Sequence, residues 1–90
     1  MAPTVRVRLA ALLHSYTGGR DVVDATGRTV GEVMDDVDRQ YPGLAFRVID
    51  EQGAVRRHMN LFVGMDAAKD RSVAVPQNVE IFIVGALSGG

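Results

Sequence analysis

The chain contains no cysteine. That absence excludes disulfide bridges, thiolate metal sites and cysteine nucleophiles. Any sulfur chemistry in which the protein takes part must therefore use a group other than a side-chain thiol.

The sequence also lacks an excess of charge of either sign and a long apolar run. Ten lysines and arginines stand against eleven aspartates and glutamates, which gives a net charge of -1 and a pI of about 6.0. This balance provides no broad attraction for nucleic acid or for anionic membranes. No apolar segment approaches the length of a membrane span, and residues 1–8 lack the apolar core of a signal peptide. We therefore expect a cytoplasmic protein with neither nucleic acid nor a membrane as its partner.

What the chain does have is the composition of one soluble globular domain. Its 90 residues leave no room for a second domain, and 47% of them are apolar and 23% charged. A chain of this size buries roughly 60–65% of its unfolded surface, which is enough for one compact core.

Four segments have the alternating pattern of β-strands with one apolar face. Two further segments, 10–16 and 67–75, are less clearly patterned, and the second of them can include a short edge strand. The four predicted strands are residues 4–9, 21–25, 58–63 and 79–84.

One helix has a clear beginning and a clear end. Thr29 is a good N-cap and Glu32 follows three residues later, which is the capping-box pattern. Pro42-Gly43 ends the helix, and residues 44–49 are expected to form a helical turn against the core. The apolar stripe of the helix recurs at helical spacing and consists of Val30, Val33, Met34, Val37 and Tyr41.

The order strand, strand, helix, strand, strand predicts an α+β fold in which one main helix covers one face of a sheet. The strand residues expected to face that helix are Val5, Val7, Leu9, Met59, Leu61, Val63, Val79, Ile81 and Ile83. The other face would present Arg6, Arg8, His58, Asn60, Phe62, Glu80 and Phe82. Two phenylalanines among charges are typical of a docking surface, so we predict partner contacts through all of these residues except His58. The alternative, in which loops shield both rings, stays open.

The last predicted strand leads directly into six residues whose side chains are small apart from Leu87. Glycine has no Cβ, so Gly89 and Gly90 can enter a slot that is too narrow for any side chain. We hypothesise that the carboxylate of Gly90 is the reactive group of the protein. The alternative is a disordered tail that ends in glycine by chance. The six residues are Gly85, Ala86, Leu87, Ser88, Gly89 and Gly90.

Other candidate sites have little support in the sequence. Neither histidine has the spacing of a metal ligand, and a surface or rim position is expected for His58. Asp35, Asp36 and Asp38 fall on successive helix faces instead of converging, and Asp35 can pair with Arg39 one turn later. We therefore predict no metal site and no catalytic side chain.

Several stretches resemble the ThiS/MoaD family of β-grasp sulfur carriers, which are relatives of ubiquitin. The resemblance covers essentially the whole chain, and the length is most similar to that of CysO-type and stand-alone MoaD-like carriers. It implies a ubiquitin-like β-grasp domain over residues 1–84, with a mixed sheet of four to five strands, and a flexible tail over residues 85–90. The matching stretches are Thr17-Gly18-Gly19, Thr29-Val30-Gly31-Glu32-Val33, Tyr41-Pro42-Gly43-Leu44, Arg57-His58-Met59-Asn60-Leu61-Phe62-Val63 and the terminal Gly89-Gly90.

The resemblance also implies a carrier that binds no cofactor itself and acts as a co-substrate of partner enzymes. An adenylating enzyme of the ubiquitin-activating type would use ATP and magnesium to activate Gly90, because a free carboxylate is a poor electrophile. A sulfur donor would then displace AMP and leave a thiocarboxylate, while residues 85–89 occupy the partner's active site. A sulfur-accepting biosynthetic enzyme would take the sulfur for cysteine, molybdopterin, thiazole or a specialised metabolite, and the sequence leaves these four open.

Three departures from the family pattern affect the choice of partner, and one is Gly64-Met65-Asp66 after the third predicted strand, where an asparagine-glycine turn is expected. Family tails commonly begin with proline where this chain has Gly85, which would make the start of the tail more flexible. The turn before the last strand is Pro76-Gln77-Asn78 instead of an acidic-glycine-acidic sequence. Two alternatives to sulfur carriage also stay open: a ubiquitin-like modifier conjugated to lysines through Gly90, and a non-covalent β-grasp interaction module or small subunit.

Overall fold

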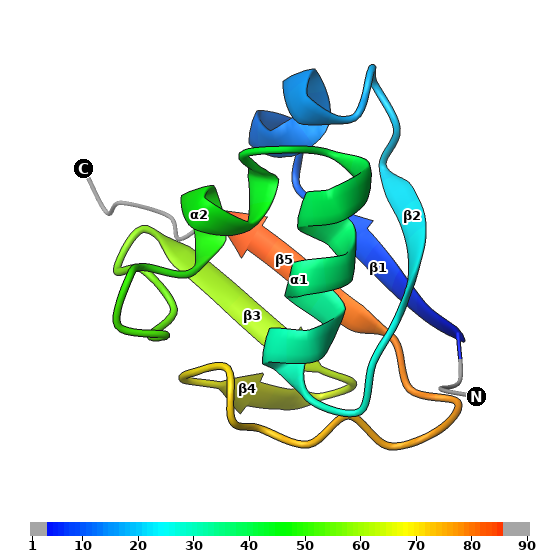
Figure 1. Cartoon of the computed structure of the whole chain (residues 1–90), viewed down its shortest axis with the longest axis vertical. Helices are drawn as coiled ribbons and strands as arrows, with labels where there is room; N and C mark the ends of the chain where they lie inside the picture. The colour runs from blue at the N-terminus through cyan, green and yellow to red at the C-terminus, as the bar shows by residue number, and fades with distance from the viewer. Residues whose placement is uncertain (1–3, 86–90) are drawn as a thin grey trace.

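The computed structural model describes residues 4–85, and within them a five-stranded mixed sheet carries one long helix across one face (Figure 1). The predicted α+β fold is confirmed. The strands lie in the order β2-β1-β5-β3-β4 across the sheet. Their bounds are Thr4–Leu9 for β1, Val22–Thr26 for β2, Met59–Val63 for β3, Asp66–Ala68 for β4 and Ile81–Gly85 for β5.

Strand β5 lies at the centre of the sheet, between the first and third strands of the chain. It pairs in parallel with β1, where Arg8 is opposite Phe82, and antiparallel with β3, where Phe62 is opposite Phe82. The remaining pairings within residues 4–85 are antiparallel. Strands β1 and β5 therefore end at the same edge of the sheet, and the chain reaches residue 85 beside the segment that follows β1.

The long helix, α1 (Val30–Gln40), begins where the capping pattern predicted. The Thr29 hydroxyl accepts a hydrogen bond from the Glu32 backbone N–H at 3.2 Å. The Glu32 carboxylate accepts from the backbone N–H of Arg28 at 2.8 Å, one residue before the cap, so the box closes one position earlier than in the usual motif. These two bonds satisfy N–H groups at the helix start, where no helical carbonyl is available to accept them.

The core lies between α1 and the face of the sheet that α1 covers. Of the strand residues predicted to face the helix, all but Val79 are buried, and Val79 is partly buried against the same cluster. The helix contributes Val30, Val33, Met34 and Val37, each at most 1% exposed, while Tyr41 is half-buried. Burying a side chain of this kind stabilises the fold by about 1.5–3 kcal/mol, so the predicted stripe provides much of the driving force.

Three segments with weak sequence patterns also have regular structure. Residues 10–16, which gave no clear prediction, include the 3₁₀ helix η1 (Ala11–Tyr16), and its Leu13 is fully buried. The predicted helical turn is α2 (Leu44–Val48), which buries Leu44 and Val48. The expected short edge strand is β4, at the outer side of β3.

The strand boundaries differ from the prediction at five places. Strand β2 is shifted by one residue at both ends, to Val22–Thr26 from the predicted 21–25. Strand β3 begins at Met59, so His58 precedes it. Strand β5 begins at Ile81, two residues later than predicted, and just before it the Glu80 carbonyl accepts a hydrogen bond from the Gly64 N–H at 2.8 Å. It ends at Gly85, which is opposite Met59 in β3, so Gly85 belongs to the sheet and not to the tail.

Arg71 fastens the loop before β5 to the start of α1. Its carbonyl accepts from the Gly31 N–H, and its own N–H donates to the Gly53 carbonyl, both at 2.9 Å. Its guanidinium pairs with Asp35 at 2.8 Å. The predicted pair of Asp35 with Arg39 is therefore wrong, and Arg39 pairs instead with Asp36 at 2.6 Å.

The helices within residues 4–85 are η1, α1 and α2, and none of them is long and apolar enough to cross a membrane.

Candidate functional site

Most of the predicted tail lies outside the described residues. The proposed reactive residue Gly90 and the residues Ala86, Leu87, Ser88 and Gly89 all follow residue 85. Gly85 is the last described residue, and its position fixes the edge of the sheet from which the chain continues.

At that edge, Gly85 lies against η1. A Cβ built on Gly85 would come within 2.7 Å of the Leu12 Cδ2 atom. The Leu12 side chain is 45% exposed, and Val84 beside Gly85 is 39% exposed. The end of β5 therefore has an apolar rim, and a larger residue in place of Gly85 would require Leu12 to move.

The sheet face opposite α1 brings together the residues predicted to dock a partner. Phe62 and Phe82 are direct cross-strand neighbours, so their Cβ atoms lie about 5 Å apart. Arg8 flanks Phe82 on one side, and Ala67 of β4 flanks Phe62 on the other. One row of side chains thus crosses four strands, with the two rings at its centre.

The predicted polar residues surround this pair. Arg8 and Glu80 form an ion pair, with 2.6 Å between the Arg8 Nε and the Glu80 carboxylate. Arg6 is exposed and lies opposite Asp24 of β2, and Asn60 is exposed opposite Val84. Because both side chains of the Arg8–Glu80 pair are more than a third exposed, that pair contributes little to stability and remains accessible to a partner.

The two rings are half-buried, so each is partly covered by its neighbours and partly open to solvent. The sequence left open an exposed pair of rings and a pair shielded by loops, and the structure lies between these two alternatives. The sequence-based docking set also omitted Val84, which shares this face and which the alternation of Phe82 and Val84 along β5 could have identified. We call Phe62, Phe82 and Val84 the apolar patch.

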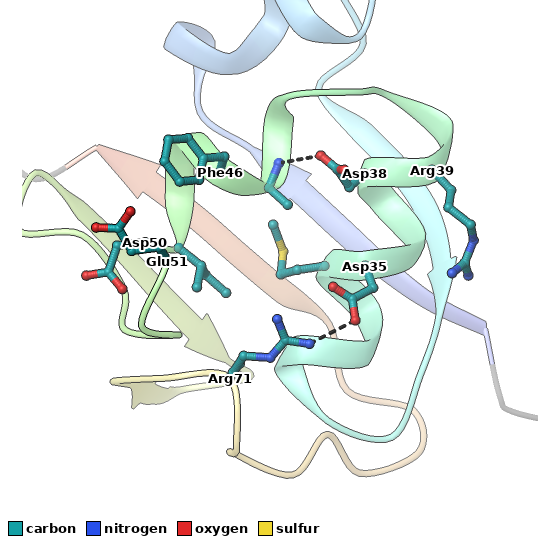
Figure 2. Close-up of a pocket in the computed structure, with 10 residues that line it drawn as sticks. Asp35, Asp38, Arg39, Phe46, Asp50, Glu51 and Arg71 are labelled. Carbon is teal, nitrogen blue, oxygen red and sulfur yellow. Dashed lines mark hydrogen bonds and ion pairs between the residues drawn. The ribbon is translucent and has the colours of Figure 1, made fainter.

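A groove of about 520 Å³ between α1 and α2 collects several carboxylates (Figure 2). The protein itself engages three of the four carboxylates, those of Asp35, Asp38 and Asp50, and Glu51 is the fourth. Asp35 pairs with Arg71, and Asp38 accepts from the backbone N–H groups of Gly43 and Ala45 at the start of α2. Asp50 accepts from backbone N–H groups of its own loop. The groove is therefore held together by structural contacts, and its carboxylates do not converge on an empty centre.

Asp36 connects α1 to β2. Its carboxylate accepts from the Arg39 guanidinium at 2.6 Å, from the Thr26 backbone N–H at 3.0 Å and from the Gln40 side chain at 3.3 Å. The hydrogen bond from Arg39, followed by the one from the Thr26 N–H, lowers the pKa of Asp36 below its ordinary value. This carboxylate is structural, since all of its partners belong to the fold.

The two histidines belong to different segments of the chain. His14 Nε2 is 3.1 Å from the Leu9 carbonyl oxygen, and His58 is exposed before β3, as expected for a surface position. Residues 4–85 hold no group of three or more histidine and carboxylate side chains that could bind a metal ion.

The chain is similar to known proteins over nearly its whole length. No protein-family model matches the chain. The sulfur carrier protein CysO of Mycobacterium tuberculosis is 29% identical to it over 91 residues, which cover 96% of this chain and 98% of the relative. The CysO of Mycobacterium bovis matches to the same extent.

Solved structures share the fold. A chain in the crystal structure of the Amycolatopsis orientalis BexX/CysO complex has a TM-score of 0.86 at 29% identity, covering 96% of this chain and 99% of that one. Mycobacterium tuberculosis CysO has a TM-score of 0.85 at 27% identity, with 92% and 99% covered. Small archaeal modifier protein 1 of Haloferax volcanii has a TM-score of 0.77 at 26% identity, with 97% and 99% covered. The chain is a ubiquitin-like β-grasp protein and a homologue of the CysO sulfur carrier proteins.

Proposed function

We propose that this protein carries sulfur as a thiocarboxylate on Gly90. The observation that carries the proposal is its similarity to CysO proteins over nearly the whole length of both chains. The final Gly89-Gly90 of the sequence is compatible with this role, because residues without side chains pass through a narrow active-site channel.

The chemistry would take place in partner enzymes. A Gly90 carboxylate oxygen attacks the α-phosphorus of ATP in a ubiquitin-activating-type enzyme that uses magnesium, and pyrophosphate leaves. A sulfide equivalent then attacks the carbonyl carbon of the mixed anhydride, and AMP leaves with the electron pair of the broken C–O bond. The thiocarboxylate product is a nucleophile, so the carrier needs no cysteine and no catalytic side chain of its own.

The apolar patch and its polar surroundings would dock the activating enzyme. Phe82 and Val84 lie on β5 directly before Gly85, so the strand that contributes to the patch also leads to the tail. Burial of Phe62 and Phe82 would provide most of the binding energy, since aromatic residues at the centre of an interface are the usual hot spots. The ion pair of Arg8 with Glu80, together with Arg6 and Asn60, would form the polar rim.

A sulfur-accepting enzyme would be the second partner. A CysO protein of Amycolatopsis orientalis is seen in a complex with BexX, which shows that a similar protein assembles with a partner. We propose that the corresponding partner of this chain is a biosynthetic enzyme. Cysteine, molybdopterin, thiazole and specialised-metabolite pathways are the candidates. Residues 86–89 would lie in that enzyme's active site, since Gly85 is paired in the sheet.

The test is activation of the whole chain by the ubiquitin-activating-type enzyme of the same host, with ATP, magnesium and sulfide. Mass spectrometry of the intact protein should show the oxygen-to-sulfur increase at the C-terminus. Deletion of Gly90 should abolish the product, whereas Met65→Ser, at a side chain that is 96% exposed in the β3–β4 turn, should leave it unchanged. Equal product from the deletion variant would reject Gly90 as the sulfur attachment site.

Conjugation to proteins is the second candidate function, because small archaeal modifier protein 1 shares the fold at 26% identity. In that case Gly90 would form an isopeptide bond with lysine side chains. Proteomics of the native host separates the two. Lysines that carry residues 72–90 of this chain, the tryptic remnant after Arg71, support conjugation, and thiocarboxylate alone supports sulfur transfer.

A further inference from the structure

A cleft lies at the edge of the sheet where β5 ends, and the proposed function gives it no role. Three segments form it: the end of η1, the beginning of α2 and the loop that leads into β3. We call it the exit cleft. It has a volume of about 360 Å³ and is lined by Tyr16, Gly43, Phe46, Arg47, Arg56 and His58.

The exit cleft is next to the point from which the chain continues beyond the sheet. Gly85 is opposite Met59, and His58 directly precedes Met59. The Met59 N–H donates to the Arg56 carbonyl at 3.0 Å, which keeps Arg56 close to the beginning of β3. Figure 1 shows β5 pointing toward the side of the molecule where α2 lies. A protein that receives the chain beyond Gly85 is therefore within reach of the exit cleft.

Arg56 is held in position and still has donors to offer. Its guanidinium carbon is 4.4 Å from the centre of the Phe46 ring, and its Nε donates to the Phe46 carbonyl oxygen at 2.7 Å. Its two terminal amino groups make no hydrogen bond to a residue in the range 4–85. A guanidinium that is already oriented loses little conformational entropy on binding and presents the forked geometry that a carboxylate matches.

The exit cleft and its border have an excess of positive charge. Arg47 and Arg56 line the cleft and Arg57 adjoins it, and none of the three forms an ion pair within the described chain, whereas three other arginines do. Asp50, in the loop between Arg47 and Arg56, is the nearby opposite charge: backbone N–H groups of Ala54 and Gln52 lower the pKa of its carboxyl group, and the charge of Arg56 lowers it further. Three arginines against this one carboxylate leave a net positive charge for an outside partner.

We propose that the exit cleft binds an acidic side chain of the enzyme that activates Gly90; this inference rests on the proposed function and names a second contact beside the apolar patch. A glutamate of the partner would bind to the free amino groups of Arg56. The rings of Phe46 and Tyr16 would contact its methylene groups, and Arg47 would add attraction at longer range. Phe46 is 60% exposed, so this open cleft suits a side chain presented by a large partner better than an enclosed small molecule.

The ligand class can be tested on the protein alone. A tetraglutamate peptide is titrated into the isotope-labelled full chain at low salt, and ATP is titrated separately. We expect the peptide to shift the Arg56 Nε–H and the Arg47 backbone signals, with binding weakened at least fivefold in Arg56→Lys, which keeps the charge and loses the fork. The matched control is Arg28→Lys, before α1 and away from the exit cleft, and it should bind like the wild type. Larger shifts with ATP than with the peptide would overturn the proposal in favour of a nucleotide site.

The partner contact is tested by the kinetics of activation with the host enzyme. In Arg47→Gln combined with Arg56→Gln, KM for the carrier should rise about tenfold with kcat within about twofold, because the contact helps docking and not chemistry. The difference from wild type should shrink as the ionic strength rises to about 0.3 M. Arg28→Gln, which removes the same type of charge elsewhere, should keep the wild-type KM.

The outcomes separate the two proposals. If the wild type is activated and the Arg47/Arg56 variant has the wild-type KM, the exit cleft is not a partner contact, and the proposed function stands. If the wild type is not activated at all, the proposed function fails and this inference fails with it. A KM that is raised in the Arg47/Arg56 variant and unchanged in Arg28→Gln supports both the proposed function and the exit cleft as a partner contact.

Discussion

Substitution of Gly31 by alanine tests the packing of Arg71 on the start of α1. A Cβ at this position would lie 2.5 Å from the Arg71 Nε and 2.9 Å from both its Cβ and its Nη2. The end of the side chain can rotate away, but the Cβ can move only with the backbone. That backbone is fixed by the bond from the Gly31 N–H to the Arg71 carbonyl and by the bond from the Val30 N–H to the Val73 carbonyl, both at 2.9 Å.

The magnitude follows from two opposed effects. Overpacking of a closely packed position costs about 1–3 kcal/mol. Alanine is a better helix former than glycine by up to about 1 kcal/mol, and this gain is smaller in the first turn, where Gly31 lies. We therefore expect Gly31→Ala to lower the free energy of unfolding by about 1–2 kcal/mol.

Arg71→Gly removes the steric conflict, because it takes away the Nε, the Nη2 and also the Cβ that lies 2.9 Å from the added methyl group. It also removes the ion pair with Asp35, which is worth at most about 1 kcal/mol because both side chains are about half exposed. Gly31→Ala should then cost less than about 0.5 kcal/mol in the Arg71→Gly background, so the two substitutions are coupled by about 1 kcal/mol.

Urea unfolding of the four proteins, followed by circular dichroism, measures this cycle. With a slope of about 1 kcal/mol per molar urea for a domain of this size, the midpoint of Gly31→Ala should fall by roughly 1–2 M. A stabilised Gly31→Ala variant, or an equal cost in both backgrounds, would refute the packing of Arg71 on Gly31 as the reason for the glycine.

Three further predictions concern stability and docking. Asp36 has a lowered pKa in the folded protein, so its contribution to the free energy of unfolding is present above the unfolded pKa of about 3.9 and is lost as the pH falls through the folded pKa. Asp36→Asn should therefore lose less stability than the wild type between about pH 5 and pH 2, which acid titrations followed by circular dichroism measure. Phe82→Ser should raise KM for activation about tenfold or more while Met65→Ser does not, and equal KM values would exclude the apolar patch as the docking surface. Gly27→Ala should lower the midpoint of thermal unfolding by about 8 °C or more, because its Cβ would lie 2.6 Å from the Val33 backbone nitrogen, and an unchanged midpoint would contradict this close approach.

Helix α1 and the buried face of the sheet could be predicted from the sequence because their signals are local. The cap at Thr29 and the stripe from Val30 to Val37 depend on residues three or four positions apart, and both are confirmed. The alternation along β1 identified its bounds correctly for the same reason. The boundaries of β5 were less accurate, because the alternating pattern continues through Val79 and Glu80 although pairing begins only at Ile81.

The parts of the candidate site that were missed depend on contacts distant in the sequence. The pairing of Asp35 with Arg71 spans 36 positions, so the nearer Arg39 was the natural but incorrect partner. The contact between Leu12 and Gly85 joins η1 to the end of β5 and has no local signature. The exit cleft also has no local signature, because its lining residues come from three separate segments of the chain.

The central place of β5 makes folding and presentation of the tail inseparable. Without β5, the sheet divides into the β1–β2 hairpin and the β3–β4 hairpin, since β5 is the strand that pairs with both β1 and β3. The sheet is therefore completed by the last strand of the described chain, through contacts with residues more than seventy positions away. A truncated or partly synthesised carrier would have neither the Phe62–Phe82 pair nor a fixed origin for the residues after Gly85. Under the proposed function, an activating enzyme that recognises both features would act only on folded chains that include β5.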